Sequence, residues 1–257
     1  MKIYALVNQK GGVGKTTTAL NVGAGIAATG KAVLLIDADQ SGNLSKSAGI
    51  ELSDDAPTVY EVLKGAADIN DAIQPAQGGK YDVLPADNML SGADVELATV
   101  PGREMLLKEA IAQLSKPYDY VLIDCPPSLN TLSLMALTAA NGVIVPVQAQ
   151  YLALDGMAQL NQTIELVKRR MNPQLNICGV LVTLYDPRKL LNKEVLESLT
   201  AAFPGKVYAT TISNNIALAE APSYGKDIFE YKPKSKGAEQ YKALTQEILQ
   251  REGLKHG

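Results

Sequence analysis

The feature that most constrains this chain is a glycine-rich stretch with two lysines at residues 8–17, which reads NQKGGVGKTT. The apolar run 3–7 comes directly before it, and an alanine-rich segment with helical periodicity follows at 15–29. Glycines let successive backbone N–H groups turn toward one anion, and the N-terminus of the following helix adds partial positive charge. The pattern therefore predicts a strand, a phosphate-binding loop and a helix, in that order.

The rest of the chain alternates short apolar runs with longer segments of helical periodicity. Several runs show no polar alternation, which is typical of strands covered on both faces in a parallel sheet. We therefore predict an α/β fold with a doubly wound, mostly parallel sheet flanked by helices. The predicted strands are 3–7, 32–36, 81–84, 119–123, 142–147, 177–182 and 206–209. The predicted helices are 15–29, 42–48, 58–64, 103–115, 130–140, 151–171, 190–202 and 235–252.

A single domain is predicted over residues 1–257, because no proline- or serine-rich linker interrupts this alternation. The loosest segment, 74–80 (QPAQGGK), is predicted to be a surface loop. Since the chain begins with its first predicted strand, we expect no N-terminal helix-turn-helix.

Composition excludes several classes of protein. Hydrophobic residues make up 46% and charged residues 20%, with a net charge of −3, so extensive disorder is excluded. The only histidine is His256, which argues against histidine-based catalysis and zinc sites. The two cysteines are too few for a disulfide framework. No apolar run is long enough for a signal peptide or a membrane span, so we predict a cytoplasmic protein.

The two lysines of the loop have different expected tasks. Lys15 precedes Thr16, and this pair would place an ammonium on the β- and γ-phosphates and a hydroxyl on Mg²⁺. Lys10 is an additional cation, which near the γ-phosphate would act like an arginine finger. Gln9 stands where the general phosphate-loop pattern has its first glycine. The predicted nucleotide-binding residues are Lys10, Gly11, Gly12, Val13, Gly14, Lys15, Thr16 and Thr17.

Three carboxylates follow predicted strands. Asp37 and Asp39 come after the run 32–36, and Asp124 ends the run 119–123. Ligands bind at the carboxyl ends of the strands in open α/β sheets, so we expect these side chains beside the phosphate loop. A carboxylate at the position of Asp124 can hold Mg²⁺ through water, because Mg²⁺ keeps much of its hydration shell.

Four stretches resemble the ParA/MinD group of P-loop ATPases with a deviant Walker A motif, and most closely the Soj/ParA partition ATPases. They are KGGVGKTT at 10–17, LIDAD at 35–39, YDYVLIDCPP at 118–127 and LAEAPS at 218–223. The resemblance covers essentially the whole chain. It implies a slow, Mg²⁺-dependent ATPase that forms an ATP-sandwich homodimer, acts in chromosome or plasmid partition and is stimulated by a ParB-like partner.

The resemblance also assigns roles to single residues. Lys10 would reach the ATP of the partner subunit, Lys15 would act on the phosphates, and Asp39 would orient the attacking water. Thr16, Asp37 and Asp124 would make up the metal site. The family usually has Pro-Gln after the second aspartate, whereas this chain has Gln40-Ser41. Residues that contact adenine are expected near Thr183 and 212–214.

Non-specific DNA binding is a further implication of the resemblance, and the match there is partial. Arg188 corresponds to a basic position of the family's DNA-binding surface, but two arginines of the family are replaced by Asn214 and Ala217. Compensating contacts are predicted from Lys226, Lys232, Lys234 and Lys236, or from 168–170 (KRR). A solvated basic face is the alternative interpretation of these lysines.

Two other functions stay open at this stage. One is a ParA-like ATPase that positions a protein cargo, for which the replaced arginines would matter little. The other, less favoured, is a metabolic P-loop enzyme that acts on a small molecule. Membrane attachment is not expected, because the segment 238–252 of the predicted helix 235–252 lacks a strongly basic polar face.

Overall fold

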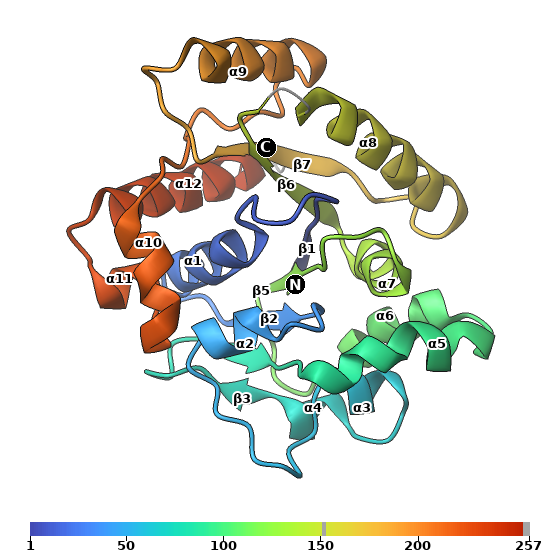
Figure 1. Cartoon of the computed structure of the whole chain (residues 1–257). Helices are drawn as coiled ribbons and strands as arrows, with labels where there is room; N and C mark the ends of the chain where they lie inside the picture. The colour runs from blue at the N-terminus through green and yellow to red at the C-terminus, as the bar shows by residue number, and fades with distance from the viewer. Residues whose placement is uncertain (151–152, 254–257) are drawn as a thin grey trace.

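The computed structural model describes residues 1–150 and 153–253. A seven-stranded sheet runs through the molecule in the order β3-β4-β2-β5-β1-β6-β7 (Figure 1). All neighbouring strands are parallel except β3, which pairs antiparallel with β4 at the edge. The predicted doubly wound, mostly parallel sheet is confirmed. The strands are β1 (Lys2–Leu6), β2 (Val33–Asp37), β3 (Gln74–Pro75), β4 (Asp82–Leu84), β5 (Tyr120–Asp124), β6 (Gly142–Gln148) and β7 (Ile177–Thr183).

Helices cover both faces of the sheet, which explains why the central strands are apolar on both sides. Figure 1 shows α1 and α12 on one side of the sheet and α7 on the other. The first layer contains α1 (Lys15–Ala27), α2 (Asn43–Ser47), α10 (Ile216–Glu220), α11 (Ile228–Tyr231) and α12 (Lys236–Gly253). The second contains α3 (Val59–Leu63), α4 (Ile69–Ala72), α5 (Ala93–Glu96), α6 (Leu106–Ala112), α7 (Thr131–Ala139), α8 (Ala153–Arg170) and α9 (Leu190–Ala202).

Two of the predicted strand and loop assignments were wrong. Residues 206–209 form no strand and make only an isolated parallel bridge between Val207 and Val180 of β7. The segment 74–80, predicted to be a loop, begins with β3, which is held by a turn in which the Ala76 amide donates to the Tyr81 carbonyl at 3.0 Å. Pro75 is tolerated there because β3 is an edge strand.

Short helices account for the other differences. The predicted helix 103–115 begins as a 3₁₀ turn (Arg103–Met105) and continues as α6 only to Ala112. The elements α4, α5, α10 and α11 were not predicted, because four or five residues are too few to show helical periodicity. Residues 151–152, at the start of the predicted helix 151–171, lie outside the described residues. In the described ranges no helix is long and apolar enough to cross a membrane.

The register of the central strands positions the candidate site. Asp37 at the end of β2 is the partner of Asp124 at the end of β5, and Leu6 at the end of β1 pairs with the same Asp124. Because parallel strands end at one edge of the sheet, both carboxylates and the loop that follows β1 meet there.

Candidate nucleotide site

The loop between β1 and α1 has the backbone geometry of an anion cradle. Gly12 and Gly14 have φ angles of 71° and 87°, in the left-handed region that favours glycine. Gly14 is the N-cap residue of α1 and no side chain caps the helix, so the first N–H groups of α1 face the loop without a side-chain acceptor. The Thr183 hydroxyl donates to the Val13 carbonyl at 2.8 Å, which ties the loop to the end of β7.

The two lysines of the loop lie in different surroundings. Lys15 is 6% exposed, and its Nζ donates to the Lys10 carbonyl at 3.4 Å. Burial lowers the pKa of Lys15, against the opposing effect of the Asp124 carboxylate. Lys10 is exposed, and its Nζ contacts the side-chain oxygen of Gln150 just beyond β6. Lys10 is therefore held by a contact at the surface, whereas Lys15 is fixed inside the loop.

Asp124 carries an oxygen atom that has no partner in the described part of the chain. Its Oδ2 accepts a hydrogen bond from the Thr16 hydroxyl at 2.6 Å, but its Oδ1 is buried and unpaired. Burial raises the pKa of Asp124 well above its usual range, and the nearby Asp37 carboxylate adds to this. A buried unpaired carboxylate oxygen is costly unless a cation or its water reaches it, so Thr16 and Asp124 fit a hydrated Mg²⁺.

Asp37 lies beside Asp124, its register partner, and both of its carboxylate oxygens already accept hydrogen bonds. Its Oδ2 accepts from the Ser45 amide at 2.9 Å and from the Ser45 hydroxyl at 2.7 Å, and its Oδ1 accepts from the Asp39 amide at 3.2 Å. Burial raises the pKa of Asp37 to about 6 although these hydrogen bonds oppose the shift. In this arrangement Asp37 fastens α2 to the end of β2.

Asp39 faces an open cavity of about 490 Å³ in front of the loop. It is half-buried and accepts a hydrogen bond from the Ser41 amide at 3.0 Å. The Ser41 hydroxyl is buried in the same wall without a hydrogen-bond partner among the described residues. We call this cavity the phosphate pocket; it is lined by Gly11, Gly12, Gly14, Lys15, Thr16, Thr17, Asp39, Gln40, Ser41, Asn43 and Pro127. Lys10 and Val13 are the predicted loop residues that are not part of its lining.

A smaller apolar pocket of about 150 Å³ adjoins the phosphate pocket and shares Gly12, Gly14 and Thr17 with it. Thr183 and residues 212–213 line it, close to where adenine contacts were expected, whereas Asn214 does not. The prediction did not name several other lining residues, among them Leu184 and Tyr241. Leu184, with φ 51°, is the only non-glycine residue of the described chain with a positive φ, and Tyr241 comes from α12. Nothing in the sequence distinguishes Tyr241 from the other core positions of that helix.

Two groups of the candidate DNA-binding residues differ in how their charges are paired. Arg188 is exposed but makes two hydrogen bonds to the Asp186 carboxylate, at 3.0 and 2.9 Å, so its charge is neutralised locally. The other group flanks the four-residue helix α11, and within the described chain none of its members is paired with a carboxylate; we call it the lysine cluster, and it consists of Lys226, Lys232, Lys234 and Lys236. The structure therefore offers a more available positive charge at the lysine cluster than at Arg188.

Comparisons with known proteins identify the family. A family model described as an AAA domain matches residues 1–177. The sporulation initiation inhibitor protein Soj of Bacillus subtilis is 47% identical over 247 residues, covering 96% of this chain and 98% of its own. The chromosome partitioning protein ParA of Caulobacter vibrioides is 45% identical over 254 residues, covering 98% of this chain and 95% of its own. The chain belongs to the Soj/ParA family of partition ATPases.

A solved structure from Mycobacterium smegmatis supports the same fold for this Soj/ParA protein. That protein, named cobyrinic acid a,c-diamide synthase, was solved with bound ADP and magnesium. It is 38% identical, with a TM-score of 0.85, and the match covers 97% of this chain and 94% of that one. The resemblance stated from the sequence motifs is confirmed.

Proposed function

We propose that this Soj/ParA ATPase is a Mg²⁺-dependent switch in DNA partition that forms an ATP-sandwich homodimer. The observation that carries the proposal is the buried, unpaired Oδ1 of Asp124. The Oδ2 of the same carboxylate accepts from the hydroxyl of Thr16, a residue that lines the glycine-built phosphate pocket. A pocket with anion-binding amides on one side and a buried, unpaired carboxylate oxygen behind is suited to a nucleotide with its cation. The M. smegmatis structure with ADP and magnesium supports ATP and Mg²⁺ as the cofactors.

Each residue of the pocket has a part in this mechanism. The backbone amides of the loop and the Lys15 ammonium bind the phosphates, and Thr16 with Asp124 holds the hydrated cation. A cation held by Thr16 and Asp124 would neutralise negative charge on the nucleotide's phosphates. Asp39, on the opposite wall, orients the attacking water. Asp37 keeps the Asp39 segment in place through its hydrogen bonds to Ser45 and the Asp39 amide.

Lys10 acts between subunits in this proposal. Two observations support that role. Lys10 is not part of the lining of its own phosphate pocket, and its ammonium contacts Gln150 at the surface. A single exposed hydrogen bond contributes little free energy, so Lys10 can leave Gln150 for another partner. In the dimer the Lys10 ammonium leaves Gln150 and contacts the γ-phosphate of the ATP bound to the partner subunit. An ammonium at that place stabilises the charge that develops during transfer.

We further propose that the protein works in the cytoplasm and has two partners, non-specific DNA and a ParB-like activator. The unpaired lysine cluster supports DNA contact, because cations that neutralise phosphates release condensed counterions. The relatives named for chromosome partitioning support a cargo of DNA. A long-lived ATP dimer needs slow intrinsic hydrolysis, so turnover is expected to rise when the activator binds.

The testing experiment uses the Asp39→Ala variant, which should bind ATP without turning it over. Analytical ultracentrifugation compares this variant with ADP, with ATP, and with ATP plus a short duplex. A doubled mass in ATP alone, with co-sedimentation of the duplex, is the expected result. A dimer that ignores DNA at low salt would redirect the proposal to the positioning of a protein cargo. A monomer in ATP would contradict the sandwich dimer.

A metabolic role is the second candidate, and the name of the M. smegmatis protein is the observation that favours it. The two hypotheses differ in what accelerates ATP hydrolysis. Duplex DNA with a ParB-like protein should raise turnover in a partition ATPase. A small acid or amide substrate should raise it in a metabolic enzyme, and a rise with such a substrate alone would replace the partition mechanism.

A further inference from the structure

Outside the nucleotide site, a groove of about 620 Å³ lies in the second helical layer. One wall is formed by α3 and α4, and the other by α5, the 3₁₀ helix η2 (Leu97–Thr99) and α6. Within the described chain it shares no lining residue with the phosphate pocket or the apolar pocket beside it. We call it the α3–α6 groove; it is lined by Val62, Leu63, Lys64, Gly65, Ala67, Asp68, Ile69, Glu96, Leu97, Val100, Leu106, Glu109, Ala110 and Gln113.

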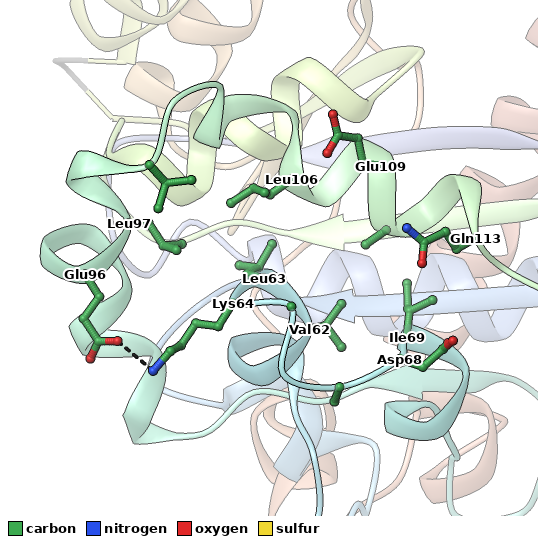
Figure 2. A pocket seen from close by; sticks show the side chains of 14 residues that line it. Val62, Leu63, Lys64, Asp68, Ile69, Glu96, Leu97, Leu106, Glu109 and Gln113 are labelled. Atoms are coloured by element: carbon green, nitrogen blue, oxygen red, sulfur yellow. Dashed lines mark ion pairs between the residues drawn. The ribbon is translucent and has the colours of Figure 1, made fainter.

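The base of the groove is apolar and belongs to the core of the domain. Figure 2 shows Leu63 and Leu106 approaching from opposite walls, with Leu97 at one end and Ile69 at the other. Leu63, Ile69 and Leu97 are at most 4% exposed, so the base is rigidly packed, whereas Leu106 is half-buried. An apolar base between two helical walls is the usual setting for a helix that inserts aliphatic side chains at i, i+3, i+4 and i+7.

The rim of the groove is acidic. Lys64 and Glu96 form an ion pair at 2.9 Å at one end and neutralise each other. Asp68 and Glu109 are exposed, and neither is paired with a cation in the part of the chain that the structure describes. Asp68 caps α4 by accepting from the Asn70 amide at 2.8 Å, and this hydrogen bond lowers the pKa of Asp68 and keeps it charged. The rim therefore has two uncompensated negative charges.

We propose that the α3–α6 groove binds a basic amphipathic helix of a partner protein. Leucine-like side chains of that helix fill the apolar base, and its lysines or arginines meet Asp68 and Glu109. The acidic rim repels nucleotides and nucleic acids, so the groove is a protein-binding surface separate from the polyanion surface at the lysine cluster. Because it is also separate from the phosphate pocket, the inference does not depend on the proposed ATPase cycle.

The test uses a fluorescein-labelled helical peptide of about fifteen residues, with leucine at i, i+3, i+4 and i+7 and lysine on the opposite face. Fluorescence anisotropy is measured with the full chain in the absence of nucleotide, so that failure of the proposed dimer cannot affect the result. Saturable binding with a Kd on the order of micromolar is expected. Two control peptides, one with the leucines scattered and one with glutamate in place of lysine, should bind at least about tenfold more weakly.

Variants of the protein test whether the peptide binds in the α3–α6 groove. Asp68→Asn with Glu109→Gln removes both charges, and asparagine retains the cap of α4. This double variant should weaken binding about tenfold, whereas Glu194→Gln with Glu197→Gln on the exposed face of α9 should leave it unchanged. A benzophenone in place of one leucine should crosslink to residues 62–69 or 96–113. Equal binding by both double variants, or crosslinks confined to other segments, would overturn the proposal.

Discussion

At the scale of single residues, the free oxygen of Asp124 gives the sharpest prediction. Asp124→Asn keeps the shape of the side chain and the hydrogen bond with Thr16 but removes the charge that supports the cation. Loss of such an indirect metal partner costs about 10–100-fold in metal affinity or activity. A Mg²⁺ titration of ATPase activity should therefore show that shift, and the exposed Asp71→Asn variant serves as the control. Equal Mg²⁺ dependence of Asp124→Asn and wild type would remove Asp124 from the metal site.

A second residue-scale prediction concerns Lys10, whose contact with Gln150 offers a matched control. Lys10→Ala should abolish ATP-dependent dimerisation while nucleotide binding survives, because Lys15 and the loop amides stay in place. Gln150→Ala removes only the surface contact and should still dimerise. Light scattering with ATP and titration of a fluorescent ATP analogue check both properties. A Lys10→Ala protein that dimerises normally would contradict action across the subunit interface.

The sequence is most informative for residues whose expected roles are local. Lys15 and Thr16 lie next to each other in one loop, and the residue types alone specify a phosphate site. The difference between Asp37 and Asp124 was not predictable, because it depends on Ser45, eight residues away, turning its amide and hydroxyl onto Asp37. Tyr241 was missed for the same reason: it reaches the apolar pocket only through the packing of α12 on α1.

At the scale of elements, Glu247 fastens α12 to the segment that follows the isolated bridge at Val207. Glu247 accepts from the amides of Ala209 and Thr210, at 2.8 and 3.0 Å, and forms an ion pair with Arg251 at 2.7 Å. These bonds also explain why 206–209 does not extend the sheet, since the Ala209 amide is bonded to the α12 side chain. Burial alone would raise the pKa of Glu247, but the two amides and Arg251 hold it below its usual value.

The Glu247→Gln variant should therefore lose stability in a pH-dependent way. At pH 7 the cost is about 1–3 kcal/mol, the range for breaking charged hydrogen bonds. Because the folded-state pKa is depressed, the stabilisation is present above the unfolded-state pKa of about 4.3 and is lost as the pH falls through the folded-state value. Urea unfolding at pH 7 and pH 4 should show the difference from wild type narrowing at the lower pH. If the difference in unfolding free energy between wild type and Glu247→Gln were the same at both pH values, the charge of Glu247 would not be its cause. The control variant, Glu239→Gln on the exposed side of α12, should change the stability little at either pH.

The elements that the sequence predicted well are those with enough residues to show a period. The strands near 3–7, 32–36 and 119–123 and the helix 190–202 are long apolar or amphipathic segments, and the structure has them within about a residue or two. The second wall of the α3–α6 groove lies in a part of the chain whose helices are too short for hydrophobic periodicity to predict their bounds. It is made of short helices between 93 and 112, whose positions depend on packing against α7 and α3.

At the scale of the whole molecule, the two basic regions make different predictions for DNA binding. The lysine cluster is unpaired, whereas Arg188 is bound to Asp186 and must break that pair to reach a phosphate. Replacing all four lysines of the cluster by alanine should lower the slope of log K against log salt by up to about 3.6, at roughly 0.9 per phosphate contact. Arg188→Ala should change the same slope by less than about 0.9, the value for one phosphate contact.

Anisotropy with a labelled duplex, ATP and the Asp39→Ala background measures this slope over a range of salt concentrations. Because neither region lines the phosphate pocket, each variant should still dimerise in ATP, and that dimerisation is the control for folding. The opposite result would be a salt slope that is unchanged when all four lysines are replaced but smaller in Arg188→Ala. That result would place the DNA-binding surface at the loop between β7 and α9. The net charge of −3 makes either result informative, since the molecule has no general positive field and attraction to a polyanion has to come from a local patch.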